Sequence, residues 1–105
     1  MSLIKIIIYK TSTDKKPFSD WLKCLDQTTR SIINTRLKRI NLGNFGDSKI
    51  LTAGIWELRV DYGSGYRIYF GKENRTIVVL LVGGDKKSQK QDIAKAQKYW
   101  LDYKG

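Results

Sequence analysis

The stretch Ile55–Phe70, IWELRVDYGSGYRIYF, predicts a β-hairpin and decides the fold of this chain. Apolar and polar residues alternate on both sides of a Gly-Ser-Gly turn at positions 63–65, as they do in strands with one buried face. A three-residue turn places Asp61 opposite Arg67 and gathers the apolar residues on one face, whereas a slip by one residue would mix the faces. The sequence therefore predicts an open polar face, formed by Glu57, Arg59, Asp61, Arg67 and Tyr69. Behind it we expect a buried apolar face, formed by Trp56, Leu58, Val60, Ile68 and Phe70.

Before the hairpin, the sequence predicts a strand, two helices and a short strand. Residues 3–9 are rich in isoleucine, which favours a strand. Pro17 is suited to open a first helix, and Asp26 stands where a second helix needs an N-cap. Gly43 can end that second helix, because glycine readily adopts the left-handed conformation found there. Residues 49–51 then predict a short strand.

After the hairpin, the sequence predicts a central strand and a last helix. Residues 77–82 form an unbroken apolar run, typical of a strand covered on both faces, and Gly83-Gly84 is expected to end it. Ser88 and Gln91 have the spacing of a capping box at the start of the last helix. The expected class is α+β, with an antiparallel sheet, two N-terminal helices and a C-terminal helix in a single domain over residues 1–105.

The composition favours a polyanionic partner and excludes several kinds of site. The net charge is +10, so nucleic acid is the leading partner class, an acidic protein is the second and a membrane surface is the third. The chain has one cysteine, Cys24, and no histidine, which excludes an internal disulfide and the Cys/His clusters of zinc sites. We expect no metal, no small-molecule cofactor, no membrane partner and a cytoplasmic location.

Three blocks of sequence form a specific combination. Gly54–Arg59 has the pattern G-x-x-E-L-R, Gly65–Phe70 has the pattern G-Y-R-x-Y-F, and Gly83–Ile93 has the pattern G-G-x-K-x-x-Q-x-x-D-I. In this order and spacing, the blocks resemble the HigB-like addiction-module killer proteins, a phage-derived branch of the RelE/ParE superfamily of toxins.

The resemblance implies a fold, an activity and a set of partners. The expected fold is RelE-like, and the expected function is that of the toxin in a type II toxin–antitoxin module, which inhibits translation by metal-independent mRNA cleavage on the ribosome. The implied partners are a cognate helix-turn-helix antitoxin, the ribosome and mRNA. The superfamily also contains ParE-like toxins that poison DNA gyrase, and a nucleic-acid-binding module without catalysis is a third alternative. Fold alone does not decide among them.

Two arginines on the polar face of the hairpin are the leading site residues. Arg59 and Arg67 are expected on adjacent strands, close enough to clamp one phosphate, and the planar fork of a guanidinium fits phosphate oxygens. Pairing of Arg67 with Asp61 is compatible with this role, because a carboxylate can orient an arginine that still faces a ligand. Lys49 stands where the resemblance places a basic site residue.

The segment after the central strand is the second candidate. Glycines followed by a helix N-terminus expose backbone N–H groups, and Lys86 and Lys87 add positive charge, so we expect an anion seat that binds RNA. The chain has no histidine for proton transfer, and Tyr69, Asp85 or a lysine with a lowered pKa is expected to serve instead.

Overall fold

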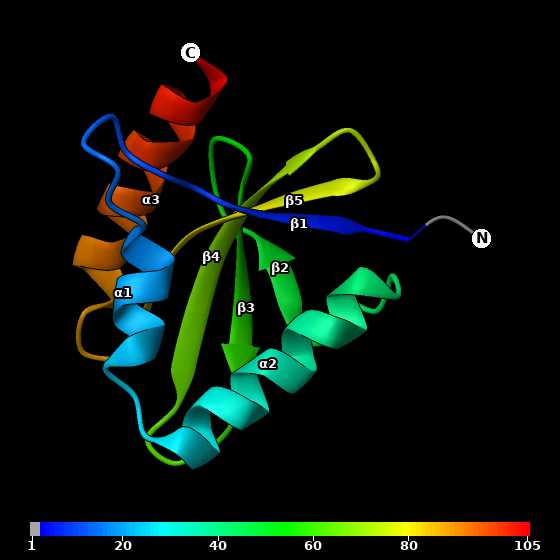
Figure 1. Cartoon of the computed structure of the whole chain (residues 1–105), viewed down its shortest axis with the longest axis vertical. Coiled ribbons are helices and arrows are strands. Elements are labelled where there is room, and N and C mark those ends of the chain that lie inside the picture. Colours follow the sequence, from blue (N-terminus) through cyan, green and yellow to red (C-terminus); the bar gives the residue numbers. More distant parts are fainter. Residues whose placement is uncertain (1–2) are drawn as a thin grey trace.

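A five-stranded sheet with helices on both faces forms the framework of the chain (Figure 1). The computed structural model describes residues 3–105. The elements in chain order are β1 (Lys5–Ile8), α1 (Pro17–Lys23), α2 (Gln27–Asn41), β2 (Ser48–Ile50), β3 (Ile55–Val60), β4 (Tyr66–Glu73), β5 (Ile77–Asp85) and α3 (Gln89–Lys104). The α+β class, the two N-terminal helices and the C-terminal helix are confirmed.

The strands are ordered β1-β5-β4-β3-β2 across the sheet. β2, β3, β4 and β5 follow one another as antiparallel neighbours, as the sequence predicts. β1 instead pairs with β5 in parallel, so the sheet is not, as the sequence predicts, antiparallel throughout. Parallel neighbours need a long connection, and here both early helices and the β2–β4 strands lie between the two strands in the sequence.

The sheet divides the core into two layers, one on each of its faces. α1 and α2 cover one face of the sheet, and α3 covers the other (Figure 1). The layer under α1 and α2 includes the buried side chains of Phe18, Ile33, Ile40, Leu58, Ile68, Phe70 and Leu80. The layer under α3 includes the buried side chains of Tyr9, Ile55, Tyr69, Val79, Leu81, Ala96 and Trp100. The predicted apolar face is buried except for Trp56, which is half-buried.

The β3–β4 hairpin pairs in a register two residues away from the predicted one. Arg59 lies opposite Arg67 and Val60 opposite Tyr66, so the loop comprises residues 61–65 rather than 63–65. Asp61 therefore leaves the sheet, and the predicted Asp61–Arg67 pair does not form. The faces stay as predicted, because side chains repeat every two residues and an even shift moves none of them to the other face.

Gly83 and Gly84 lie inside β5 and do not end it, contrary to the sequence prediction. They pair with Ile68 and Arg67 of β4. A Cβ atom at Gly83 would collide with the indole of Trp21, and one at Gly84 would collide with the carboxylate of Asp92. Glycine is thus needed at these two positions for the close approach of α1 and α3 to the sheet, not for a turn.

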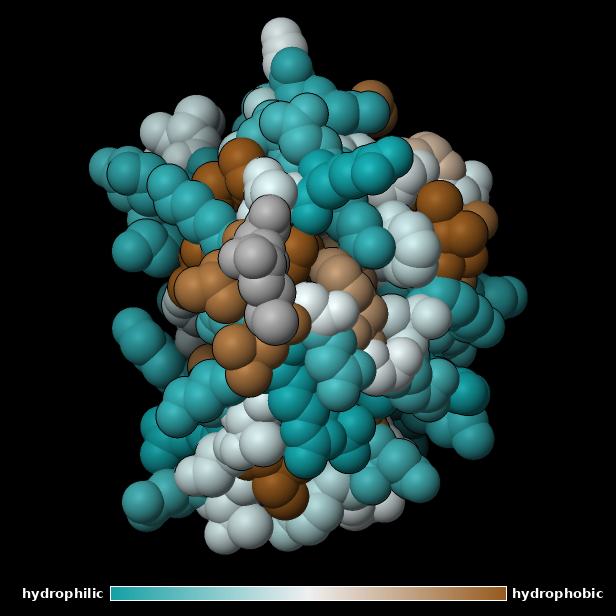
Figure 2. All heavy atoms as spheres, turned by 90° about the vertical axis from the view of Figure 1, so that its right-hand side faces the viewer, coloured by the Kyte–Doolittle hydropathy of each residue, from teal (hydrophilic) through white to brown (hydrophobic). Residues whose placement is uncertain are grey.

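The surface carries small apolar patches among mostly hydrophilic side chains on the side shown in Figure 2. Large apolar residues that are well exposed include Leu3, Leu42, Ile50 and Leu101. No helix within residues 3–105 has the length and apolar character needed to cross a membrane.

The predicted N-cap of α2, Asp26, is confirmed, and it makes the stability of the protein depend on pH. The Asp26 carboxylate accepts hydrogen bonds from the hydroxyl and the backbone N–H of Thr29, and these bonds lower the pKa of Asp26. A lowered pKa means that the cap stabilises the fold above the unfolded value near pH 4 and loses this effect as the pH falls through the folded value. Replacing Asp26 with alanine should lower the melting temperature at pH 7, and the difference from wild type should shrink below about pH 4.

The control for this prediction is Asp26→Asn, which keeps a capping side chain without a titrating group. Thermal unfolding followed by circular dichroism from pH 3 to pH 8 measures all three proteins. A melting difference between wild type and Asp26→Ala that stays constant over this range would show that the carboxylate charge contributes nothing.

Candidate functional site

Two rows of residues cross the α3 face of the sheet at right angles to the strands. The first row places Arg59 opposite Arg67, which lies opposite Gly84 of β5. The second row comprises Lys49, Glu57, Tyr69 and Val82. Directly opposed like charges destabilise a sheet, so each arginine of the first row needs a compensating group.

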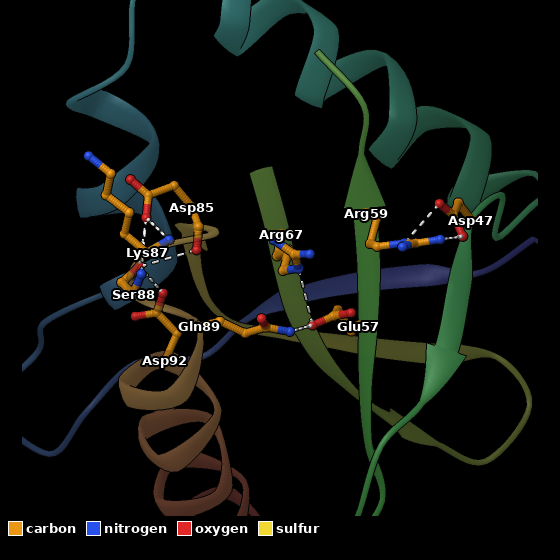
Figure 3. Close-up of polar contacts among 9 residues, drawn as sticks. All are labelled: Asp47, Glu57, Arg59, Arg67, Asp85, Lys87, Ser88, Gln89 and Asp92. Atoms are coloured by element: carbon orange, nitrogen blue, oxygen red, sulfur yellow. Dashed lines mark hydrogen bonds and ion pairs between the residues drawn. The ribbon is translucent and has the colours of Figure 1, made fainter. Parts of the chain in front are cut away.

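Arg59 has an exposed carboxylate partner. Its Nε and Nη2 atoms lie 3.1 and 3.4 Å from the two carboxylate oxygens of Asp47, and both side chains are about half exposed. Figure 3 shows Arg59 extended toward Asp47 and away from Arg67. An exposed ion pair of this kind contributes at most about 1 kcal/mol, so a phosphate could readily compete for Arg59.

Arg67 has a buried carboxylate partner, Glu57 instead of the predicted Asp61. The Arg67 Nε atom lies 3.6 Å from Oε2 of Glu57, and the side chains are 13% and 1% exposed. The amide of Gln89, in the first turn of α3, donates a hydrogen bond of 3.2 Å to the same carboxylate oxygen (Figure 3). Arg67 is therefore fixed from below by β3 and α3, and it does not stand free on an open face.

Tyr69 and Glu57 are buried beneath α3, so the predicted open polar face is open only at its Arg59 end. The Tyr69 hydroxyl has no hydrogen-bond partner within residues 3–105. Burial, and then the negative charge of Glu57, raise the pKa of Tyr69. The structure thus places Tyr69 away from solvent, where it cannot exchange a proton with a bound RNA.

In the β5–α3 turn, the backbone N–H groups that were expected to bind an anion already bind the chain's own Asp85 carboxylate. Oδ1 of Asp85 accepts hydrogen bonds from the backbone N–H groups of Lys87 and Ser88, at 2.9 and 3.1 Å. These bonds, that of Ser88 foremost, lower the pKa of Asp85. The predicted capping box does not form, because the Ser88 hydroxyl donates to Asp92 and makes no cap hydrogen bond (Figure 3). The Asp85 carboxylate is therefore ionised at neutral pH within the turn before α3, which makes it a poor general acid.

Two adjoining hollows open beside the arginines. The first has a volume of about 310 Å³, and its lining includes Arg59, Arg67, Lys86 and the 63–65 turn. The second has a volume of about 340 Å³ and is lined by Ser64, Asp85, Lys86 and Lys87. Because the two hollows share Ser64 and Lys86, we describe them together as the arginine groove. It carries four cationic side chains, those of Arg59, Arg67, Lys86 and Lys87, and three carboxylates, those of Asp47, Asp61 and Asp85.

The other predicted site residue lies apart from this groove. Lys49 is exposed on the edge strand β2, opposite Glu57, and lines neither hollow. Within residues 3–105, no three carboxylate or thiol side chains gather as possible metal ligands. The structure thus brings together both arginines with Lys86 and Lys87 and leaves out Lys49. It adds Asp47, Glu57 and Gln89 as neighbours of the arginines.

Comparison with known proteins gives a family match that includes all the residues lining the arginine groove. Residues 20–100 match the family described as "Phage derived protein Gp49-like", which belongs to the RelE/ParE-like toxin clan. An uncharacterized protein of Haemophilus influenzae is 47% identical over 81 residues, which cover 76% of this chain and 82% of that protein. The chain therefore belongs to the Gp49-like family of phage-derived proteins, within the RelE/ParE-like toxin clan.

Proposed function

We propose that this protein is a HigB-like toxin of a type II toxin–antitoxin module, which stops translation by cutting mRNA on the ribosome without a metal ion. The observation that carries the proposal is the direct opposition of Arg59 and Arg67 in a groove that Lys86 and Lys87 also line. Each arginine already has a carboxylate neighbour, and a phosphate would give the two guanidinium groups one shared anionic partner in place of the exposed Asp47.

The groove supplies the electrostatic part of such a cleavage. When the 2′-hydroxyl of RNA attacks the neighbouring phosphate, negative charge builds on the non-bridging oxygens. A guanidinium that is already oriented, as Arg67 is by Glu57, can stabilise this charge with only a small adjustment. Arg59, held only by an exposed ion pair, would turn from Asp47 toward the phosphate.

Proton transfer falls to the lysines of the groove. Tyr69 is buried, and the Asp85 carboxylate is engaged by two backbone N–H groups. Of the predicted groups, this leaves a lysine. Lys49 lies outside the groove, whereas Lys86 lines both hollows and Lys87 lines one of them. General acid or base catalysis contributes about 10²–10⁴-fold, so an alanine at the responsible lysine would leave slow cleavage.

Controlled expression in bacterial cells tests the proposed function. Wild type should stop protein synthesis and produce new RNA ends inside coding regions occupied by ribosomes, while chromosomal DNA stays intact. Lys98→Ala is the matched control, since it removes an exposed lysine of α3 outside both hollows and should leave toxicity unchanged. DNA breaks with intact mRNA would establish the gyrase alternative, and neither effect at high expression would favour a binding module without catalysis.

A further inference from the structure

We infer that Glu57 is a positioning residue of the arginine groove, whose buried carboxylate aims the guanidinium of Arg67 while α3 holds the carboxylate through Gln89. The inference concerns a residue that does not itself reach the groove, because Glu57 is only 1% exposed. The orientation of Arg67 by Glu57 does not depend on the proposed function. The effect of this orientation on RNA cleavage rests on the proposed function.

Glu57 is buried, which makes a carboxylate costly there unless it is paired. The neighbours on the same face of β3, β4 and β5 include Ile55, Tyr69 and Val82, all of them buried. Replacing a buried ion pair by apolar residues of similar volume is often neutral or stabilising in proteins. Core stability alone therefore gives no reason for a carboxylate at this position, whereas orientation of Arg67 does.

The geometry directs Arg67 outward. Glu57 faces the inner nitrogen, Nε, of the guanidinium, and the side chain of Arg67 lines the hollow beyond. Within residues 3–105, no side chain or carbonyl accepts a hydrogen bond from the terminal nitrogens of Arg67. The two terminal nitrogens are thus left for a ligand, in the planar arrangement that binds two phosphate oxygens.

The contact is held by charge and leaves room to adjust. At 3.6 Å the Arg67–Glu57 pair is longer than a hydrogen bond, and Arg67 Nε, Glu57 Oε1 and the Tyr69 hydroxyl have no hydrogen-bond partner in the described part of the chain. Gln89 fixes only one oxygen of the carboxylate. The guanidinium can therefore tighten against Glu57 when a phosphate binds at its outer edge.

Exchange of the Arg67 Hε proton tests the geometric part without any assay of function. In ¹⁵N-labelled full-length protein at pH 6, this proton should exchange with water slowly in wild type, because Glu57 and α3 shield it. Glu57→Gln should accelerate the exchange by about tenfold or more, since a contact between charged groups is lost. Asp47→Asn, which removes the carboxylate beside Arg59, is the matched control and should leave the Arg67 proton unchanged.

Single-turnover cleavage of ribosome-bound mRNA tests the catalytic consequence. Glu57→Gln should lower the rate constant by about tenfold or more, because Arg67 is no longer aimed at the reacting phosphate. Its affinity for RNA should not weaken, because removing a negative charge makes the groove more positive. If Glu57 had only a structural role, its substitution would lower the cleavage rate and the RNA affinity together. The folded fraction, measured by circular dichroism, is used to correct the cleavage rate for unfolded protein.

The outcomes distinguish the two proposals. Unchanged exchange at Arg67 in Glu57→Gln would overturn the positioning role. Accelerated exchange together with a wild type that cuts no RNA would uphold the positioning role and overturn the proposed function. If Glu57→Gln does not fold, Glu57→Asp takes its place, because it keeps the charge, withdraws the carboxylate by one methylene group and should accelerate exchange in the same direction.

Discussion

Replacing Arg67 with lysine should lower the rate of mRNA cleavage by about 10²–10³-fold, the usual cost of losing one electrostatic contact in a transition state. Lysine keeps a positive charge near Glu57 but lacks the planar fork that binds two phosphate oxygens. The protein should therefore stay folded while toxicity falls. Cleavage of ribosome-bound mRNA under single-turnover conditions and thermal unfolding of the same preparation measure the two effects.

Arg67→Ala should behave differently, because the structure corrects the expectation of an exposed Arg67. The side chain is 13% exposed, and its removal leaves the buried Glu57 carboxylate without its countercharge. Breaking a buried pair from one side costs about 3–5 kcal/mol. The double variant Glu57→Gln/Arg67→Ala should recover stability without recovering cleavage. Full cleavage by Arg67→Lys would remove Arg67 from the proposed mechanism, and a double variant no more stable than Arg67→Ala would contradict the buried pair.

The sequence predicted the elements of the fold well and their pairing less well. Patterns local to each segment identified the strands and helices, and Asp26 caps α2 as expected. The hairpin register differs by two residues, because alternation constrains only whether a shift is odd or even. Gly83 could either end a strand or allow a close contact within it, and the sequence does not distinguish the two roles. In the structure it allows the close approach of Trp21, which only the three-dimensional packing reveals.

The charged residues of the candidate site were predictable, but the depth at which each one lies was not. Glu57 and Arg59 lie two residues apart on the same face of β3, so the alternating pattern predicts the same exposure for both. In the structure that face runs from core to solvent, since Ile55 and Glu57 are buried under α3 and Arg59 is exposed. Ile55 was the available signal, because an apolar residue at the start of the polar face indicates that something covers that end.

Replacing Trp100 with alanine should lower the free energy of unfolding by about 3–5 kcal/mol, the usual cost of removing a large buried aromatic side chain. Trp100 is 5% exposed, and its indole packs against β4 at Gly71, where any Cβ atom would collide with the ring. This loss is a large part of the roughly 5–15 kcal/mol that stabilises a typical domain. Urea unfolding followed by circular dichroism measures it, and Leu101→Ala, at a neighbouring residue that is 68% exposed, should change stability by less than about 0.5 kcal/mol.

The contact between Trp100 and Gly71 should also couple the two positions. In the wild type, Gly71→Ala forces a methyl group against the indole and should cost about 1–3 kcal/mol or more. In the Trp100→Ala protein the obstruction is gone, and alanine restricts the unfolded chain more than glycine does, so the same change should be neutral or stabilising. The two substitutions should therefore differ from additivity by about 1–3 kcal/mol. Additive effects would show that α3 does not rest on β4 at Gly71.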